Sequence, residues 1–119
     1  MTLEPTGTLG TPWGGYAALV DGVQVGECAF KTMPVHGRVE IAYHTFDAFR
    51  GRGYATAMAR GLIEIARLAD ARLLIRAQTL PGTNASVALL QKLGFEFQGT
   101  VHHAEDGDVW AWHLPNQLG

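Results

Sequence analysis

The segment FDAFRGRGYAT (residues 46–56) joins an alternating, strand-like run to a long amphipathic run through a loop that holds two glycines and two arginines. The first N–H groups of a helix have no intrahelical partner, and the helix dipole adds about half a positive charge at that end. A strand, a glycine-rich turn and a helix N-terminus together therefore make an anion site. The segment predicts a bound phosphate between a strand and a helix.

A hairpin and a third strand are expected before this loop. Residues 16–20 and 23–30 are rich in strand-forming types, and the Asp21-Gly22 pair between them favours a type I′ turn. Residues 38–45 alternate as a strand. This alternation places Glu40, Ala42 and His44 on one face and Val39, Ile41, Tyr43 and Thr45 on the other. Residues 1–12 carry two prolines and two glycines without periodicity, which predicts an irregular lead-in.

The order of elements after the loop indicates a mixed sheet. Apolar residues at three- and four-residue spacing predict a helix over residues 53–69. The remaining expected elements are a strand at 73–77, a helix at 85–93 capped by Thr83 or Asn84, and strands at 95–100 and 109–114 joined by a loop at 103–108. The fold class is α/β (α+β): a mostly antiparallel meander that feeds a βαβ crossover, with a single domain over 13–119.

Composition narrows the class of protein. The chain has 119 residues, with 47% hydrophobic and 17% charged content, as expected of one globular domain. A net charge of −2 with only two lysines gives no reason to expect nucleic acid. The absence of a long apolar run predicts no membrane span, so we expect a cytoplasmic protein. Cys28 lies in an apolar run, which favours an inert, buried thiol, and the scattered histidines predict no metal site.

Two motifs together resemble one known family. Residues 50–55 fit the pattern Arg/Gln-x-x-Gly-x-Gly/Ala, which is similar to the acyl-CoA-binding motif of the GNAT superfamily of N-acetyltransferases. One βα unit later, residues 79–95 (TLPGTNASVALLQKLGF) resemble the fourth-helix segment of that superfamily, in particular its ribosomal-protein N-terminal acetyltransferase branch. The resemblance covers about residues 16–114. It implies the acyl-CoA N-acyltransferase fold and acetyl-CoA as acyl donor.

The resemblance also assigns roles to individual residues. It implies that the backbone of Tyr43, His44 and Thr45 holds the pantetheine arm, and that Thr83 or Asn84 hydrogen-bonds it, although Asn84 can equally be a helix cap. Gly51 and Gly53 let the backbone approach a pyrophosphate closely. The residues expected around the pyrophosphate are Arg50, Gly51, Arg52, Gly53, Tyr54, Ala55 and Thr56.

The catalytic assignments leave alternatives open. In the family a glutamate at about the position of Glu40 is the general base, whereas the alternative is an edge charge or a partner of Arg38. His44, on the same face, is the second candidate base, because imidazole titrates near neutral pH. The tyrosine that many members use as general acid falls on Leu90, so Ser86 is the available substitute, unless it is merely a capping or solvated serine.

The short N-terminus affects the expected acceptor side. Family members begin with a strand and two helices that wall the acceptor side, and residues 1–12 are too few to supply most of them. We therefore expect either an open site for an exposed amine on a large substrate or a homodimer in which a second chain closes the site. The predicted reaction moves an acetyl group from acetyl-CoA to a primary amine, and the alternative is a non-catalytic acyl-CoA-binding domain. Protein N-termini, aminoglycosides, polyamines and amino acids all remain possible acceptors.

Overall fold

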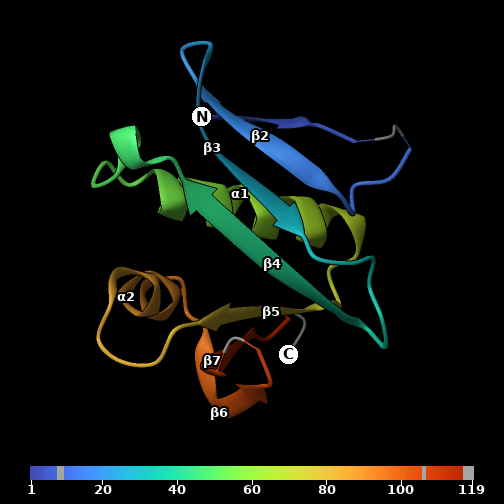
Figure 1. Ribbon diagram of the computed structural model, residues 1–119. Helices are drawn as coiled ribbons and strands as arrows, with labels where there is room; N and C mark the ends of the chain where they lie inside the picture. The colour runs from blue at the N-terminus through green and yellow to red at the C-terminus, as the bar shows by residue number, and fades with distance from the viewer. Residues whose placement is uncertain (8–9, 106, 117–119) are drawn as a thin grey trace.

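The computed structural model describes residues 1–7, 10–105 and 107–116, and shows one mixed sheet with two α-helices (Figure 1). The strands are β1 (Thr2–Pro5), β2 (Gly15–Val20), β3 (Val23–Phe30), β4 (Arg38–Thr45), β5 (Leu74–Thr79), β6 (Glu96–His103) and β7 (Gly107–Leu114). The helices are α1 (Tyr54–Ala69) and α2 (Ala85–Lys92), with a short 3-10 helix at Asp47–Phe49. No helix in the described ranges is long and apolar enough to cross a membrane.

The seven strands lie in the order β1-β2-β3-β4-β5-β7-β6. Five of the six strand pairings are antiparallel, and β4 with β5 is the parallel pair, as the predicted crossover requires. The β2–β3 hairpin turns at Asp21 and Gly22, whose φ angles of 50° and 78° are those of the predicted type I′ turn. The predicted fold class is confirmed.

Helix α1 packs on β3 and β4 and supplies much of the core (Figure 1). Its apolar stripe is fully buried at Met58, Ala59, Leu62 and Ala66, which is the periodicity that predicted the helix. The same core cluster contains buried side chains of the two central strands, among them Val39 and Ile41 of β4, which the alternation placed on one strand face. The stripe therefore fixes α1, and with it the loop at residues 50–53, against β4.

The N-terminal segment departs from the prediction. Thr2–Pro5 form β1 and pair in register with β2, so the irregular lead-in expected over residues 1–12 is wrong for these four residues. Leu3 explains the strand, because its side chain packs against α1 at Gly61 and adds to the core. A single apolar residue among threonines and prolines is too weak a signal for periodicity to detect. The described part of residues 6–14 contains no helix, so β1 passes to β2 without the two helices of the family pattern.

Other boundaries differ by a few residues. β5 continues two residues beyond the predicted end, because the Oγ1 atom of buried Thr79 accepts a hydrogen bond of 3.0 Å from Trp112 Nε1. β6 and β7 extend through His103 and from Gly107, so the expected loop at 103–108 is a tight connection. Position 106 in that connection lies outside the described residues.

Gly26 on β3 allows close packing of β3 against β4 and α1. A β-carbon at this position would overlap the carbonyl oxygen of His44 and lie 3.0 Å from Met58 Cε and 3.2 Å from Thr45 Cα. We expect Gly26→Ala to lower the free energy of unfolding by about 1–3 kcal/mol in urea titrations, the usual cost of overpacking. Gly14→Ala is the matched control, since nothing lies within 4 Å of its added β-carbon. Equal stability of the two variants would contradict this account of Gly26.

Candidate functional site

The parallel strands β4 and β5 separate along their length. Their pairing covers Arg38–Glu40 of β4 against Leu74–Arg76 of β5 and then stops, although both strands continue. β4 stays paired with β3 up to Thr45, and β5 stays paired with β7 up to Thr79. The facing edges beyond Glu40 and Arg76 therefore hold backbone N–H and C=O groups that no neighbouring strand satisfies, inside a sheet where such groups are normally paired.

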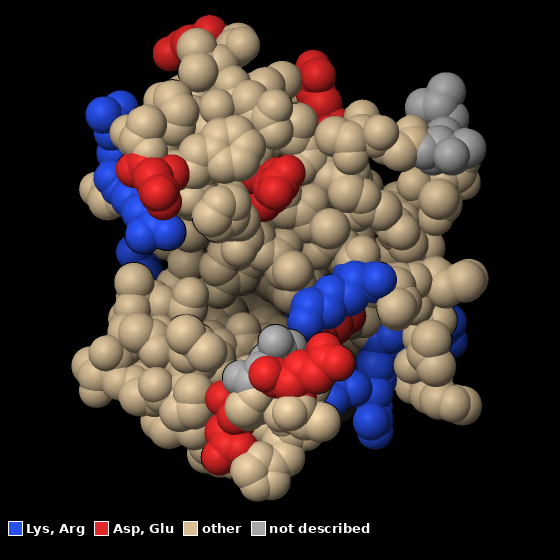
Figure 2. All heavy atoms as spheres, viewed as in Figure 1, with Lys and Arg blue, Asp and Glu red and all other residues tan. Residues whose placement is uncertain are grey.

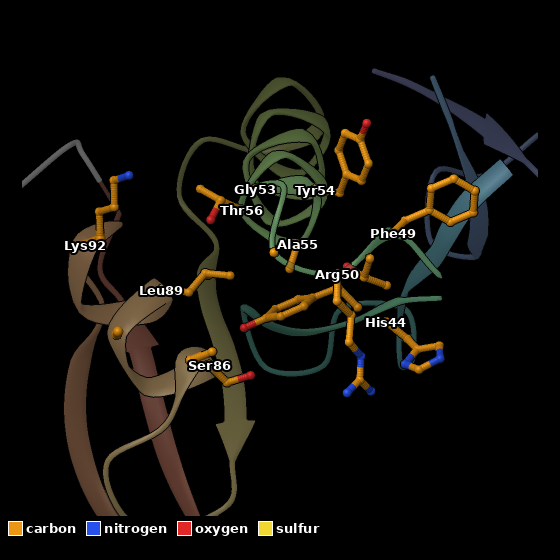
Figure 3. Close-up of a pocket in the computed structure, with 15 residues that line it drawn as sticks. His44, Phe49, Arg50, Gly53, Tyr54, Ala55, Thr56, Ser86, Leu89 and Lys92 are labelled. Carbon is orange, nitrogen blue, oxygen red and sulfur yellow. The ribbon is translucent and has the colours of Figure 1, made fainter. Parts of the chain in front are cut away.

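A cavity of about 600 Å³ lies at this opening (Figure 3). One side is formed by the end of β4, the loop after it and the start of α1, and the other by α2. Figure 3 shows Ser86 and Leu89 of α2 across the cavity from Arg50, Ala55 and Thr56. The lining residues are Tyr43, His44, Thr45, Phe49, Arg50, Gly51, Gly53, Tyr54, Ala55, Thr56, Ala85, Ser86, Ala88, Leu89 and Lys92.

The loop at residues 50–53 has the backbone conformation of an anion cradle. Gly51 and Gly53 have φ angles of 79° and 81°, a region that L side chains rarely adopt, and open space surrounds the position of an added β-carbon at each. The first hydrogen bond within α1 runs from the Ala57 N–H to the Gly53 carbonyl. The three preceding helical N–H groups, at residues 54–56, therefore have no acceptor in the helix, and they belong to residues that line the cavity.

A buried polar atom in the same cavity also lacks a partner. Thr45 Oγ1 is buried and, among the described residues, has no hydrogen-bond partner. An unmet polar atom in a buried position costs free energy unless a ligand or water satisfies it. Together with the unpaired strand edges and the free helix N–H groups, Thr45 indicates an elongated ligand that offers hydrogen-bonding groups along its length and an anion at one end.

The cationic side chains near the cavity differ in position. Arg50 and Lys92 line it, whereas Arg52 does not and instead lies with its guanidinium carbon 5.9 Å from the centre of the Phe49 ring. Arg50 Nη2 is 3.1 Å from Asp47 Oδ1, and both side chains are exposed. Lys92 had no role in the sequence prediction, because only its place on the far end of α2 brings it to the cavity.

A second hollow of about 320 Å³ opens on the face of the sheet away from α1. Figure 2 views the molecule from the side opposite α1. The residues that line this hollow are Thr6, Gly15, Tyr16, Glu27, Cys28, Ala29, Ala42, Tyr43 and His44. Tyr43 and His44 line both hollows, so β4 forms the partition between them. Glu27, which the sequence reasoning did not select, is the cross-strand neighbour of His44 and has no cationic partner among the described side chains.

Glu40 lies outside both hollows. Its Oε2 atom is 2.6 Å from Lys31 Nζ, and its side chain is 18% exposed. The parallel register also places it beside Arg76. The partner is thus Lys31 rather than the Arg38 considered from the sequence. The carboxylate of Glu40 is already paired with Lys31, so it is less free to accept a proton from an amine. The geometry therefore favours the exposed His44 as the proton acceptor.

The residues predicted to act from the start of α2 differ in whether they line the cavity. Ser86 lines the larger cavity, while Thr83 and Asn84 do not. Asn84 is the N-cap: its Oδ1 accepts from the Val87 N–H at 2.9 Å, and its Nδ2 donates to the Leu80 carbonyl at 3.0 Å. Leu90 is fully buried in the core and has no proton to donate.

Cys28 and the tryptophans are explained by packing. Burial raises the pKa of the Cys28 thiol to about 11, which confirms the expectation of an inert, buried group. Trp112 is buried, and Trp13 packs edge-on against Phe30 with ring centres 5.0 Å apart. Trp110 packs on Phe97 in the same way, at 5.1 Å. Contacts within the chain thus account for these three tryptophans.

Comparison with known proteins agrees with this geometry. The family model described as acetyltransferase (GNAT) domain matches residues 6–96, which is most of the chain. The chain therefore belongs to the GNAT acetyltransferase family. A comparison with curated proteins gave no significant match.

Solved structures share the fold at low sequence identity. A ribosomal-protein-alanine N-acetyltransferase from Brucella melitensis matches with a TM-score of 0.73 at 24% identity, over 85% of this chain and 67% of that one. A Bacillus subtilis acetyltransferase in complex with CoA matches with a TM-score of 0.73 at 23% identity, over 87% and 77%. The ribosomal-protein-S5-alanine acetyltransferase of Vibrio fischeri matches with a TM-score of 0.75 at 17% identity, over 87% and 61%. This chain thus spans about two thirds of the length of two of these three structures.

Proposed function

We propose that this protein transfers an acetyl group from acetyl-CoA to a primary amine by direct attack in a ternary complex. The observation that carries the proposal is the opening between β4 and β5, which ends at the glycine loop and the uncapped start of α1. In this proposal the pyrophosphate takes the free N–H groups of residues 54–56, and Arg50 and Lys92 add charge. The unpaired edge of β4 and Thr45 hold the pantetheine arm. The predicted contacts of Arg52, Thr83 and Asn84 have no support from the cavity lining.

The second hollow supports an acceptor that arrives from the opposite face. An amine there would lie beside Glu27 and His44, next to the β4 backbone that the thioester also contacts. Glu27 would attract the ammonium, and His44 would accept its proton so that the neutral nitrogen can attack the carbonyl carbon. Backbone N–H groups on the open edge of β4 would stabilise the developing oxyanion. Cys28 is buried and therefore not placed to form a covalent acetyl intermediate. Direct attack of the amine on the thioester needs no such intermediate.

The openness of this face favours an amine on a large substrate. The described part of residues 6–14 forms no helix, and Thr6 of this segment lines the second hollow. A homodimer that closes the hollow, a cytoplasmic location and the identity of the amine all stay predictions.

An assay of thiol release tests the proposed function. Acetyl-CoA is incubated with the protein and separately with an N-terminal peptide, spermidine, kanamycin or a free amino acid, and CoA thiol is detected with Ellman's reagent. We expect thiol release with at least one amine, and a mass increase of the amine that corresponds to one acetyl group. The second candidate function, an acyl-CoA-binding domain without catalysis, is favoured by the buried Leu90 at the acid position. Binding of acetyl-CoA without thiol release from any amine would support that candidate instead.

A further inference from the structure

The proposed reaction lacks an obvious proton donor for the leaving thiolate. Leu90, at the position where many relatives carry a tyrosine, is fully buried and made of hydrocarbon. Ser86 supplies a hydroxyl on the α2 side of the cavity, but an alcohol is a far weaker acid than a phenol. Two phenols from other elements line the cavity, Tyr43 of β4 and Tyr54 of α1. Figure 3 shows the Tyr54 hydroxyl pointing away from Ser86, which leaves Tyr43, a residue that the sequence reasoning valued only for its backbone.

Tyr43 lies on β4 where this strand no longer pairs with β5. Its neighbours Val39 and Ile41 on the same strand face are buried, whereas Tyr43 is only partly buried and lines the larger cavity. The separation of the strands beyond Glu40 leaves room for its ring between β4 and α2. The phenol therefore stands in the opening that the acyl donor would enter, on the partition next to the acceptor hollow.

The Tyr43 phenol and the Ser86 side chain of α2 line the same cavity. Burial raises the pKa of Tyr43 above its ordinary value of 10.0, and the Ser86 side chain lowers that pKa in part. A neighbouring hydroxyl that lowers the pKa of a phenol favours the ionised form of that phenol. The phenol thus stays protonated at neutral pH, while Ser86 would stabilise the negative charge left after proton transfer.

We propose that Tyr43 is the proton donor to the CoA sulfur, with Ser86 positioned to assist it. This inference rests on the proposed function. As the amine nitrogen bonds to the carbonyl carbon, the carbon–sulfur bond breaks and its electron pair goes to sulfur. The sulfur then takes the proton of Tyr43 Oη. The attacking nitrogen releases one proton to solvent as the amide forms, and the phenolate takes up one proton from solvent, so the protons balance. The donor function thus comes from β4 instead of α2, which explains how a leucine is accommodated at position 90.

The first test is independent of turnover. Ultraviolet difference spectra are recorded on adding CoA or desulfo-CoA, which lacks the sulfur, to the wild-type protein and to Tyr43→Phe. We expect a tyrosine difference band near 285 nm that is larger with CoA than with desulfo-CoA in the wild type and equal with the two ligands in the variant, where Tyr54 remains in the cavity. Equal bands with the two ligands in the wild type, or an unchanged excess with CoA in the variant, would overturn the contact between phenol and sulfur. This test needs CoA binding only, so absent transfer with an intact CoA-specific band would refute the proposed function and leave the contact standing.

The second test uses the amine that gives thiol release. Tyr43→Phe keeps the ring, so we expect an unchanged affinity for CoA by calorimetry and a kcat lowered about 100-fold, the usual scale of a lost general acid. We expect Ser86→Ala to lower kcat several-fold in the wild type and to have no further effect in the Tyr43→Phe background, because Ser86 acts through Tyr43. A kcat within threefold of wild type in Tyr43→Phe, or an equal effect of Ser86→Ala in both backgrounds, would overturn the proposal. The latter result would make Ser86 itself the donor.

Discussion

Replacing Gly51 and Gly53 together with alanine should weaken acetyl-CoA binding about 100-fold. Both residues have φ angles near 80°, where an alanine costs about 1–2 kcal/mol each, and the sum corresponds to this change in affinity. The strain would be relieved by moving the loop out of the conformation that turns the N–H groups of residues 54–56 toward the cavity. Isothermal titration calorimetry of each variant with acetyl-CoA measures the loss directly.

Gly22 provides a matched control for this prediction. Its φ angle is 78°, it has no atom within 4 Å of an added β-carbon, and it lies in the β2–β3 turn away from both hollows. Gly22→Ala carries a similar backbone strain, so it should lower stability without changing the affinity for acetyl-CoA. An affinity of the double variant within threefold of wild type would show that the loop does not bind the pyrophosphate.

The largest catalytic effect is expected at His44. We predict that His44→Gln lowers kcat/KM at neutral pH at least about 100-fold, because the amine then loses its proton acceptor. The glutamine amide keeps a polar side chain at this position but accepts no proton, so the loss reports the missing base. Glu40→Gln should retain kcat/KM within a few-fold, because Glu40 is bonded to Lys31 outside the hollows. Values of kcat/KM at neutral pH with the amine that shows turnover provide the measurement.

The opposite outcome would restore the family's pattern. If Glu40→Gln lowers kcat/KM about 100-fold and His44→Gln leaves it within a few-fold of wild type, Glu40 is the base and its ion pair with Lys31 opens when the amine binds. Lys31→Met is the informative companion variant, because it frees Glu40 without changing the carboxylate. On our account, Lys31→Met affects stability and leaves the rate unchanged.

Local sequence signals were sufficient for most of the fold. The Asp21-Gly22 turn, the apolar stripe of α1 and the glycines at 51, 53 and 94 each have a preferred backbone geometry, and the structure shows positive φ at all of these positions and a buried stripe. β1 could not be predicted, because it depends on a long-range contact between Leu3 and Gly61 rather than on a local pattern. The extra length of β5 likewise depends on the distant pair Trp112 and Thr79.

The candidate site was predictable only in part for the same reason. In our proposal residues 50–56 act through their backbone, whose conformation depends on their own sequence, and most of them line the cavity. The side chains of Glu27, Tyr43 and Lys92 come to the hollows from three separate elements, so no spacing in the sequence signals them. The family resemblance implied a contact from Thr83 or Asn84, but capping of α2 already uses both polar ends of the Asn84 amide.

A calorimetric titration of acetyl-CoA into the protein tests the central claim most directly. We predict one acetyl-CoA bound per chain with a Kd below about 1 mM, since the cavity presents a preformed anion cradle and an open strand edge. At a ligand concentration of 100 times Kd, binding should add about 2.7 kcal/mol to the free energy of unfolding and raise the Tm accordingly. The absence of both binding heat and any Tm shift at millimolar acetyl-CoA would contradict the account.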